Sequence, residues 1–341
     1  RRDFTILLGR ISRVPRAGIG QFLHTCLVQE IIATNAIEGV HSTKREIRAA
    51  METTPEDRLR MRLGGVVNKY ARILQGEEIS LHTPADVRGL FDTFLADEIR
   101  RANPDNLPDG RLFRRSSVDI VSSSQKTIHR GSYPEEEIVR DMEKALAILH
   151  EEQMPLLHRM AIFHYLFGYI HPFYDGNGRM SRFITTYFLA REFHPTVALQ
   201  LSLLIKKRRT KYYKLFAETT SAHNCGDLTP FIRGTLRFIH AAIDYTGEAL
   251  ESRLLQYQRY RDIALDGIGD KTMRGVYDVL LQAAVFSDIG ATVEEIARTL
   301  DRTETTIYAK LKRIPEVHLH QNRSSRPFHY MLRLEEFSVS L

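Results

Sequence analysis

The sequence predicts a mainly α-helical protein that also carries one short β-hairpin and a C-terminal winged helix-turn-helix. Apolar residues recur at three-to-four spacing along most of the 341 residues, which is the periodicity of packed helices. Apolar and polar residues alternate near residues 118–128 and 317–332, which indicates strands there. Hydrophobic residues make up 43% and charged residues 26%, as expected of a globular protein with a sizeable core.

We predict three parts along the chain. Residues 1–95 have the pattern of several helices, with a break at Gly64-Gly65. Residues 96–245 contain the hairpin, the densest cluster of chemically active residues and the helices that flank it. Residues 246–341 change character and are predicted as a linker helix followed by the winged helix-turn-helix.

In the first part, apolar spacing predicts a helix that ends near residue 39. Thr34 and Glu38 are four residues apart and therefore lie on one face of this helix. Gly39 suits the left-handed position that ends a helix. Thr43 with Glu46 forms a capping-box pattern that opens the next helix.

The hairpin is predicted from the alternating residues Val118, Ile120 and Ile128. Tyr133-Pro134 followed by three acidic residues indicates the start of the next helix.

The most informative segment spans residues 171–182. His171 can accept a proton near neutral pH, and Asp175 is a hard oxygen ligand of the kind that binds Mg²⁺ beside phosphates. The apolar run 160–170 is predicted as the buried helix that leads into this segment. His171 followed by Pro172 is also the pattern of an ordinary helix-ending turn.

The second half of this segment has the pattern of a polyphosphate site. Gly176, Asn177 and Gly178 can present backbone N–H groups at a helix start, where the helix dipole favours an anion. Arg179 and Arg182 share a helix face, and each offers a planar fork for phosphate oxygens. The alternative for the two arginines is a solvated helix face. The combination of a base, a metal ligand and an anion-binding helix start favours a functional site.

The pattern His-x-Phe-x-Asp-Gly-Asn-Gly-Arg-x-x-Arg resembles the signature of the Fic family of nucleotidyltransferases. The resemblance implies that His171 deprotonates a target hydroxyl, Asp175 holds Mg²⁺ on the phosphates of ATP, and Phe173 anchors the loop. It also implies that Arg179 binds phosphate and Arg182 holds the γ-phosphate. The anion hole implied by the resemblance is formed by Gly176, Asn177 and Gly178.

Gly178 stands where the phosphorylating branch of the Fic family carries a lysine, which favours transfer of AMP. The implied acceptor is a Ser, Thr or Tyr hydroxyl of a target protein, or of this protein itself. Removal of AMP, another donor such as UTP, and a DNA-binding regulator with a nucleotide-sensing Fic core are the alternatives.

Residues 34–39 resemble the inhibitory motif of Fic proteins, Ser/Thr-x-x-x-Glu-Gly/Asn, at Thr34, Glu38 and Gly39. The resemblance implies that Glu38 pairs with Arg182 and competes with the γ-phosphate for its donors. A surface position for Glu38 near a helix end is the alternative.

The hairpin resembles the Fic flap, which holds a target segment as an added strand. An ordinary connecting hairpin is the alternative. The residues assigned to the flap are Thr127, Ile128, His129, Arg130 and Gly131.

In the last part, a polar linker helix is predicted from about Ala241 to Leu265, and a capping box at Thr292 and Glu295 opens the helix-turn-helix. Glu304 near the start of the second helix disfavours DNA, so a protein-contact or dimerisation module is the alternative. Five basic residues of this part are candidates for phosphate contacts with DNA: Lys310, Lys312, Arg313, Arg323 and Arg326.

Composition limits the remaining expectations. Two cysteines, Cys26 and Cys225, predict neither a disulfide framework nor a zinc site, and they favour the cytoplasm. The net charge of +6 and pI near 9.2 are compatible with nucleotide or nucleic-acid partners. Lacking a run of 18 apolar residues, the chain is predicted to have no membrane partner. A homodimer is a further expectation.

Overall fold

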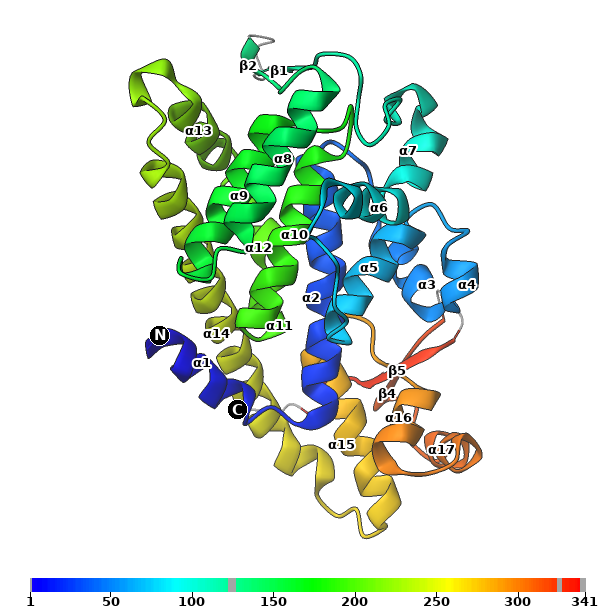
Figure 1. Cartoon of the computed structure of the whole chain (residues 1–341). Helices are drawn as coiled ribbons and strands as arrows, with labels where there is room; N and C mark the ends of the chain where they lie inside the picture. Colours follow the sequence, from blue (N-terminus) through cyan, green and yellow to red (C-terminus); the bar gives the residue numbers. More distant parts are fainter. Residues whose placement is uncertain (1, 122–126, 324–326, 338–341) are drawn as a thin grey trace. The chain divides into compact units, whose positions relative to one another are not determined.

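The computed structural model describes residues 2–121, 127–323 and 327–337. The protein is mainly helical, with a two-stranded hairpin and a small three-stranded sheet near the C-terminus (Figure 1). This confirms the mainly α-helical fold class with a short hairpin that the sequence predicts.

The chain divides into two compact units. One unit is Leu27–Ala242, and the other combines Arg1–Cys26 with Ile243–Leu341. The long helices α2 (Arg16–Ile37) and α14 (Thr229–Leu265) contribute residues to both units. The three-part division made from the sequence stays a prediction.

The larger unit carries the candidate site. Its hairpin is antiparallel, with Ile120 opposite His129. Besides the parts of α2 and α14 that fall within it, its elements are α3 (Lys44–Glu52), α4 (Pro55–Arg58), α5 (Gly64–Leu74), α6 (Pro84–Phe94), α7 (Ala96–Ala102), η1 (Pro104–Asn106), β1 (Asp119–Val121), β2 (Thr127–Arg130), α8 (Glu135–Leu149), α9 (Leu156–Ile170), α10 (Asn177–Glu192), α11 (Pro195–Ala198), α12 (Leu201–Lys207), α13 (Arg209–Thr220) and η2 (Ala222–Asn224).

The core of this unit is built around α9 and α10, which pack against each other (Figure 1). Phe183 of α10 is fully buried, with its ring centroid 5.1 Å from that of Tyr70 and 4.6 Å from that of Phe94. Burial of one such ring stabilises the fold by roughly 1.5–3 kcal/mol. Because α10 is buried over most of its length, the polar residues of its first turns are held in fixed positions.

A buried carboxyl group attaches the C-terminal half of α2 to α10 and α12. Glu30 is 0% exposed. It accepts hydrogen bonds from the Ser202 backbone N–H (2.8 Å), the Ser202 hydroxyl (2.5 Å) and the Thr186 hydroxyl (3.3 Å). Burial raises the pKa of Glu30 to about 7, although the bonds from Ser202 act in the opposite direction.

Replacement of this group should change the pH dependence of stability. The folded state binds the Glu30 proton more tightly than the unfolded state, so its contribution is complete below about pH 4.5 and is lost as pH rises to about 7. The loss is on the order of 3 kcal/mol, from about 1.4 kcal/mol per pKa unit. We expect Glu30→Gln to flatten this part of the profile, measured by urea unfolding at a series of pH values. An unchanged slope would contradict the assignment.

Two local predictions in this unit are confirmed. The backbone N–H of Thr43 donates to the Glu46 carboxylate (2.9 Å), and the Glu46 N–H donates to the Thr43 hydroxyl (3.2 Å), which completes the capping box. The buried helix expected over residues 160–170 is α9, which begins slightly earlier, at Leu156.

The smaller unit contains the C-terminal sheet, in the strand order β3-β5-β4. The capping box of Thr292 and Glu295 is present. β4 and β5 lie in the segment 317–332, where strands were predicted. β3 was not predicted. The assignment of this unit as a winged helix stays a prediction. Arg326 lies outside the described residues. Apart from its shares of α2 and α14, the elements of this unit are α1 (Arg2–Ile11), α15 (Lys271–Phe286), β3 (Ala291–Thr292), α16 (Val293–Leu300), α17 (Glu304–Leu311), β4 (Leu319–Asn322), β5 (His329–Leu332) and η3 (Leu334–Phe337).

One helix boundary was predicted wrongly. The linker helix expected from about Ala241 is not a separate helix, because the structure has one continuous helix, α14, from Thr229. The helix continues without a break because no proline follows Pro230 within it.

Within the described residues, every helix is too short or too polar to span a bilayer.

Candidate functional site

The loop between α9 and α10 starts with a residue in an unusual backbone conformation. His171 caps the C-terminus of α9 in the left-handed region, with φ 54° and ψ 60°. Its N–H donates to the Phe167 carbonyl (3.0 Å), which closes the last turn of α9. Such a conformation is rare for residues other than glycine, so it marks this position as one where function or surrounding contacts fix the backbone.

The imidazole of His171 is arranged to act as a base. Its Nδ1 lies 3.3 Å from the Gly168 carbonyl, which can only accept, so Nδ1 carries the proton and Nε2 is left free. Burial lowers the pKa of His171 to about 4, and the charge of Arg114 acts in the same direction. The side chain is therefore neutral at pH 7.

The middle of the loop is anchored in the core. Phe173 is 0% exposed and stacks on Phe91 with a centroid separation of 4.0 Å. The Asn177 side chain accepts from the Phe173 N–H (3.0 Å) and donates to the Phe173 carbonyl (2.7 Å). Phe173 therefore lies where an anchor is expected, while the Asn177 amide holds the loop and leaves only its backbone N–H to face a ligand.

The N-terminus of α10 has the geometry of an anion-binding site. Gly176 precedes the helix with φ +86°, and a Cβ at this position would lie 2.7 Å from Leu95 Cδ1. The first intrahelical bond runs from the Met180 N–H to the Gly176 carbonyl, so the N–H groups of Asn177 and Gly178 precede the hydrogen-bonded ladder. Together with the helix dipole, these groups favour a negatively charged ligand.

Asp175 lies at the mouth of this N-terminus, and its side chain is 40% exposed. Its Oδ1 accepts from the Gly176 N–H (2.5 Å) and lies 3.4 Å from Arg179 Nη2. In the described part of the chain, no group of three or more His, Cys, Asp or Glu side chains could hold a metal ion by itself. A single accessible carboxylate beside a phosphate site is the arrangement that suits Mg²⁺, because this ion takes its other ligands from phosphate and water.

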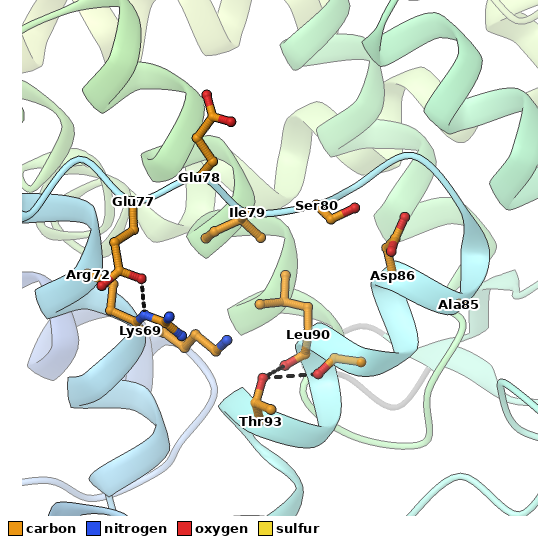
Figure 2. A pocket seen from close by; sticks show the side chains of 11 residues that line it. Lys69, Arg72, Glu77, Glu78, Ile79, Ser80, Ala85, Asp86, Leu90 and Thr93 are labelled. Atoms are coloured by element: carbon orange, nitrogen blue, oxygen red, sulfur yellow. Dashed lines mark hydrogen bonds and ion pairs between the residues drawn. The ribbon is translucent and has the colours of Figure 1, made fainter. Parts of the chain in front are cut away.

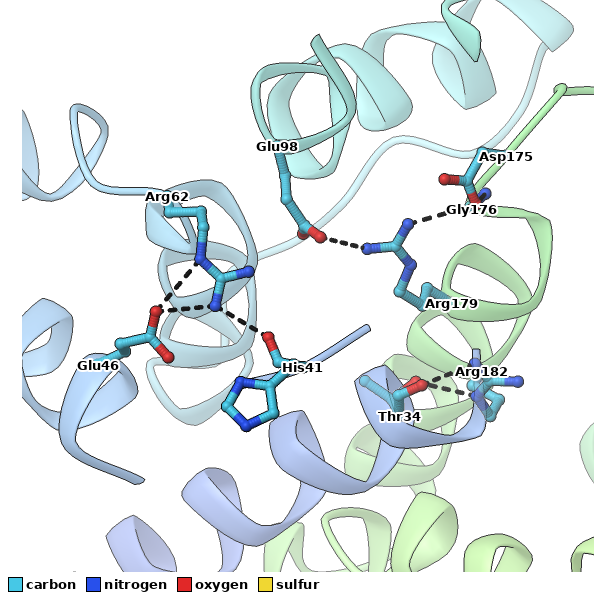
Figure 3. Close-up of polar contacts among 9 residues, drawn as sticks. All are labelled: Thr34, His41, Glu46, Arg62, Glu98, Asp175, Gly176, Arg179 and Arg182. Carbon is cyan, nitrogen blue, oxygen red and sulfur yellow. Dashed lines mark hydrogen bonds and ion pairs between the residues drawn. The ribbon is translucent and has the colours of Figure 1, made fainter. Parts of the chain in front are cut away.

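Arg179 is less accessible than a phosphate ligand is expected to be (Figure 3). Its side chain is 1% exposed, and its Nη1 pairs with Glu98 of α7 at 2.8 Å. With Nη2 directed at Asp175, the guanidinium lies between two carboxylates. The contacts assign Arg179 to holding Asp175, and its expected contact with phosphate stays a prediction.

Arg182 lies about one turn further along α10 than Arg179 and is bound by α2 (Figure 3). Its Nε donates to the Thr34 hydroxyl (2.9 Å) and its Nη2 to the Thr34 carbonyl (3.2 Å). The same Nη2 lies 2.7 Å from the Glu38 carboxylate. Burial alone would lower the pKa of Arg182, but the Glu38 carboxylate raises it above its ordinary value. The guanidinium is therefore charged, and its Nε and Nη2 are engaged by Thr34 and Glu38.

Glu38 also lies against the glycine of the anion site. A Cβ on Gly178 would collide with the Glu38 carboxylate and would lie 3.0 Å from Arg182 Nη1. Gly39, which follows directly, has φ +75°, the conformation expected for a helix-ending glycine. The three residues of the predicted inhibitory motif, Thr34, Glu38 and Gly39, therefore lie at the end of α2, and the first two contact Arg182.

The predicted flap is the second strand of the hairpin and the residue after it. β2 covers Thr127 to Arg130, and the Gly131 N–H donates to the Val118 carbonyl (3.0 Å). His129 stacks on Tyr169 of α9 with a centroid separation of 3.8 Å, so the strand is attached to the helix that ends at His171. The side chains of Thr127 and Ile128 lie outside the described structure.

A buried network behind Arg182 was not predicted from the sequence. The Thr185 hydroxyl donates to the Ser181 carbonyl (2.8 Å), so it accepts from the Nδ1–H of His164 (2.7 Å). His164 Nε2 then accepts from the Tyr212 hydroxyl (2.7 Å). Burial lowers the pKa of His164 to about 3, which keeps it neutral. The Tyr212 oxygen is thereby left to face Arg182.

The cavity drawn in Figure 2 lies elsewhere, between α5, α6 and the segment that joins them. It has a volume of about 310 Å³ and includes none of the residues that the sequence singled out. Its polar wall is partly neutralised, because Arg72 pairs with Glu77. We assign it no function.

The fold and this loop define a class of protein: a helical domain in which one loop joins a histidine in the left-handed conformation to a helix N-terminus. Residues 84–189 match the Fic/DOC family. The chain therefore carries a Fic/DOC family domain, which contains the whole loop from His171 to Arg182.

Distant relatives share this domain. The protein adenylyltransferase Fic of Drosophila ananassae is 28% identical over 210 residues, which are 60% of this chain and 38% of the relative. The protein of the same name from Culex quinquefasciatus is 40% identical over 88 residues, 25% of this chain and 16% of the relative. The match thus spans about two fifths or less of the relatives' length.

A solved structure shares the fold. The crystal structure of a Fic family protein from Desulfovibrio desulfuricans G20 covers 96% of both chains with a TM-score of 0.53 and 19% sequence identity. At this identity the likeness supports the fold alone.

Proposed function

We propose that this protein transfers AMP from ATP to a Ser, Thr or Tyr hydroxyl. The acceptor is a target protein or this protein itself. One observation carries the proposal: a single loop holds a neutral imidazole, His171, beside the free N–H groups at the start of α10. A neutral base next to an anion-binding helix start is what nucleotidyl transfer to a hydroxyl requires.

The proposed reaction uses residues of this chain at each step. His171 Nε2 accepts the proton of the target hydroxyl, and that oxygen bonds to the α-phosphorus. The bond from the α-phosphorus to the bridging oxygen breaks, and pyrophosphate leaves with the electron pair. The N–H groups of Asn177 and Gly178 stabilise the charge on the transferred phosphate, and Arg182 offers its fork to the γ-phosphate.

Asp175 is the residue proposed to hold Mg²⁺, with Arg179 fixing the orientation of its carboxylate. When bound, the ion would neutralise charge on the polyphosphate.

We further propose that Glu38 keeps the site in an inhibited state. Its carboxylate occupies Arg182 Nη2 at 2.7 Å and lies against Gly178, where the polyphosphate would have to bind. ATP that binds without this arginine would place its α-phosphate wrongly for attack. Removal of AMP from a modified protein by the same residues is the alternative activity, and UTP is the alternative donor.

The proposal is tested with ATP labelled either at the α- or at the γ-phosphate, incubated with Mg²⁺ and the Glu38→Gly protein. We expect label on protein from α-labelled ATP only, because AMP carries the α-phosphate. Label from γ-labelled ATP only would indicate phosphate transfer and would contradict the proposal. If neither label is retained, a protein that already carries AMP tests the removal activity.

DNA binding by the C-terminal module is kept as a second candidate. The candidate phosphate contacts are Lys312, Arg313 and Arg323, because Lys310 pairs with Asp270. Glu304, which opens the second helix, weighs against DNA. A homodimer and a cytoplasmic location also remain proposals.

A further inference from the structure

Arg114 has a position that neither the motif nor the proposed chemistry explains. Its side chain is 0% exposed, and no ion pair joins it to a carboxylate in the described part of the chain. Its guanidinium donates to four backbone carbonyls: Nε to His171 (2.8 Å), Nη1 to Ser116 (2.6 Å), and Nη2 to Ser132 (2.8 Å) and Ile170 (3.4 Å).

Two of these carbonyls belong to the end of the helix that carries the proposed base. Ile170 is the last residue of α9 and His171 is its cap, so their carbonyls lack intrahelical partners. A cation at this end is also favoured by the helix dipole. Arg114 thus stabilises the backbone at His171, where the left-handed conformation is costly.

The other two carbonyls belong to the two stems of the hairpin. Ser116 precedes β1, and Ser132 follows β2. The Ser132 N–H donates to the Ile170 carbonyl (3.1 Å), and the Arg114 N–H donates to the Pro172 carbonyl (3.2 Å), which adds main-chain links between the stems and the loop. One guanidinium therefore joins both stems of the flap to the backbone of His171.

Gly131 is explained by the same contacts. A Cβ at this position would lie 2.5 Å from Arg114 Nη2, 2.9 Å from the Ile170 carbonyl oxygen and 3.1 Å from His171 Cβ. Only glycine leaves room for the guanidinium between the end of β2 and the end of α9. The requirement for glycine here comes from close approach, since Gly131 is not among the residues with positive φ.

We propose that Arg114 is a positioning residue that sets the place of the flap relative to His171 Nε2. Its charge has a second effect, because after burial it contributes to lowering the pKa of His171. The inference rests on the proposed function: a hydroxyl held on the flap meets the base only if the hairpin stems and the base keep a fixed geometry. Misplacement of reacting groups by about 1 Å costs about a hundredfold in rate.

The test compares Arg114→Lys and Arg114→Gln, each in the Glu38→Gly background, with Arg140→Gln as the matched control. Arg140 is an exposed arginine of α8, outside the site. For Arg114→Lys, we expect kcat for labelling of a target peptide to fall about a hundredfold, while the KM for ATP changes less than about twofold. Arg114→Gln should lose at least as much, and Arg140→Gln should behave like its parent.

Two outcomes would overturn the inference: an unchanged kcat in folded Arg114→Lys, or equal losses in kcat and in ATP affinity. If the Arg114 variants do not fold, Gly131→Ala should reproduce the loss of kcat, because its Cβ would separate the end of β2 from Arg114 Nη2 and from the end of α9.

Amide hydrogen exchange separates this inference from the proposed function, because it needs no activity. Exchange of the β2 amides should be faster in Arg114→Lys than in Arg140→Gln, even if no variant transfers label. Absence of label in every variant together with faster exchange would reject the proposed function and retain the role of Arg114. Unchanged exchange would reject that role.

Discussion

Glu38→Gly should raise the rate of AMP transfer to the protein by about tenfold to a hundredfold. Glu38 binds Arg182 through a 2.7 Å contact whose arginine side is 1% exposed. Hydrogen bonds to charged groups contribute about 1.5–3 kcal/mol, and each 1.4 kcal/mol corresponds to a factor of ten in occupancy. Removal of the carboxylate leaves Arg182 Nη2 without its acidic partner and opens the space beside Gly178 for the γ-phosphate. Initial rates with α-labelled ATP measure the effect.

The control for this prediction is a second Glu–Arg pair outside the loop. Glu46 lies 2.8 Å from Arg62, and both side chains are partly exposed (Figure 3). Glu38→Gln should raise the rate, because it removes the charge while keeping the size, whereas Glu46→Gln should leave it unchanged. Equal rates for wild type, Glu38→Gly and Glu38→Gln would refute the inhibitory role of Glu38 even if transfer itself is observed.

His171→Ala should abolish labelling in the Glu38→Gly background. Positioned general bases contribute about 10²–10⁴-fold, so the residual rate should fall near the background of the assay. His158, an exposed histidine at the start of the same helix, provides the matched control, and His158→Ala should label like its parent.

The pH dependence gives a second readout of the base. Because burial lowers the pKa of His171 to about 4, Nε2 is unprotonated above that pH. In the Glu38→Gly protein, the labelling rate should therefore stay level from about pH 8 to pH 5 and fall only as pH approaches about 4. A fall centred near the ordinary histidine pKa of about 6.5 would show that the imidazole is not buried during the reaction.

The sequence predicted the parts of the site that are contiguous in the chain. Residues 171–182 form one loop and one helix start, so spacing alone places the base, the carboxylate and the N–H groups together. The contact between Glu38 and Arg182 also agrees with the prediction. The two residues are 144 positions apart in the sequence, and the pairing was predicted from a family resemblance.

Residues that act from a distance could not be predicted in this way. Glu98, Arg114 and Glu30 are charged residues in segments whose apolar spacing only predicts helices or a hairpin. Their burial depends on which helices pack together, and local periodicity does not contain that information. Glu30 contacts Ser202 and Arg114 contacts His171 across large stretches of chain.

The most direct test of the account is one labelling experiment with three proteins: wild type, Glu38→Gly and Glu38→Gly/His171→Ala. Each is incubated with α-labelled ATP and Mg²⁺, and label retained on protein is measured. The account predicts strong label on Glu38→Gly, little on wild type and none on the double variant. Equal label on Glu38→Gly and the double variant would contradict it, because AMP would then be attached without the proposed base, His171.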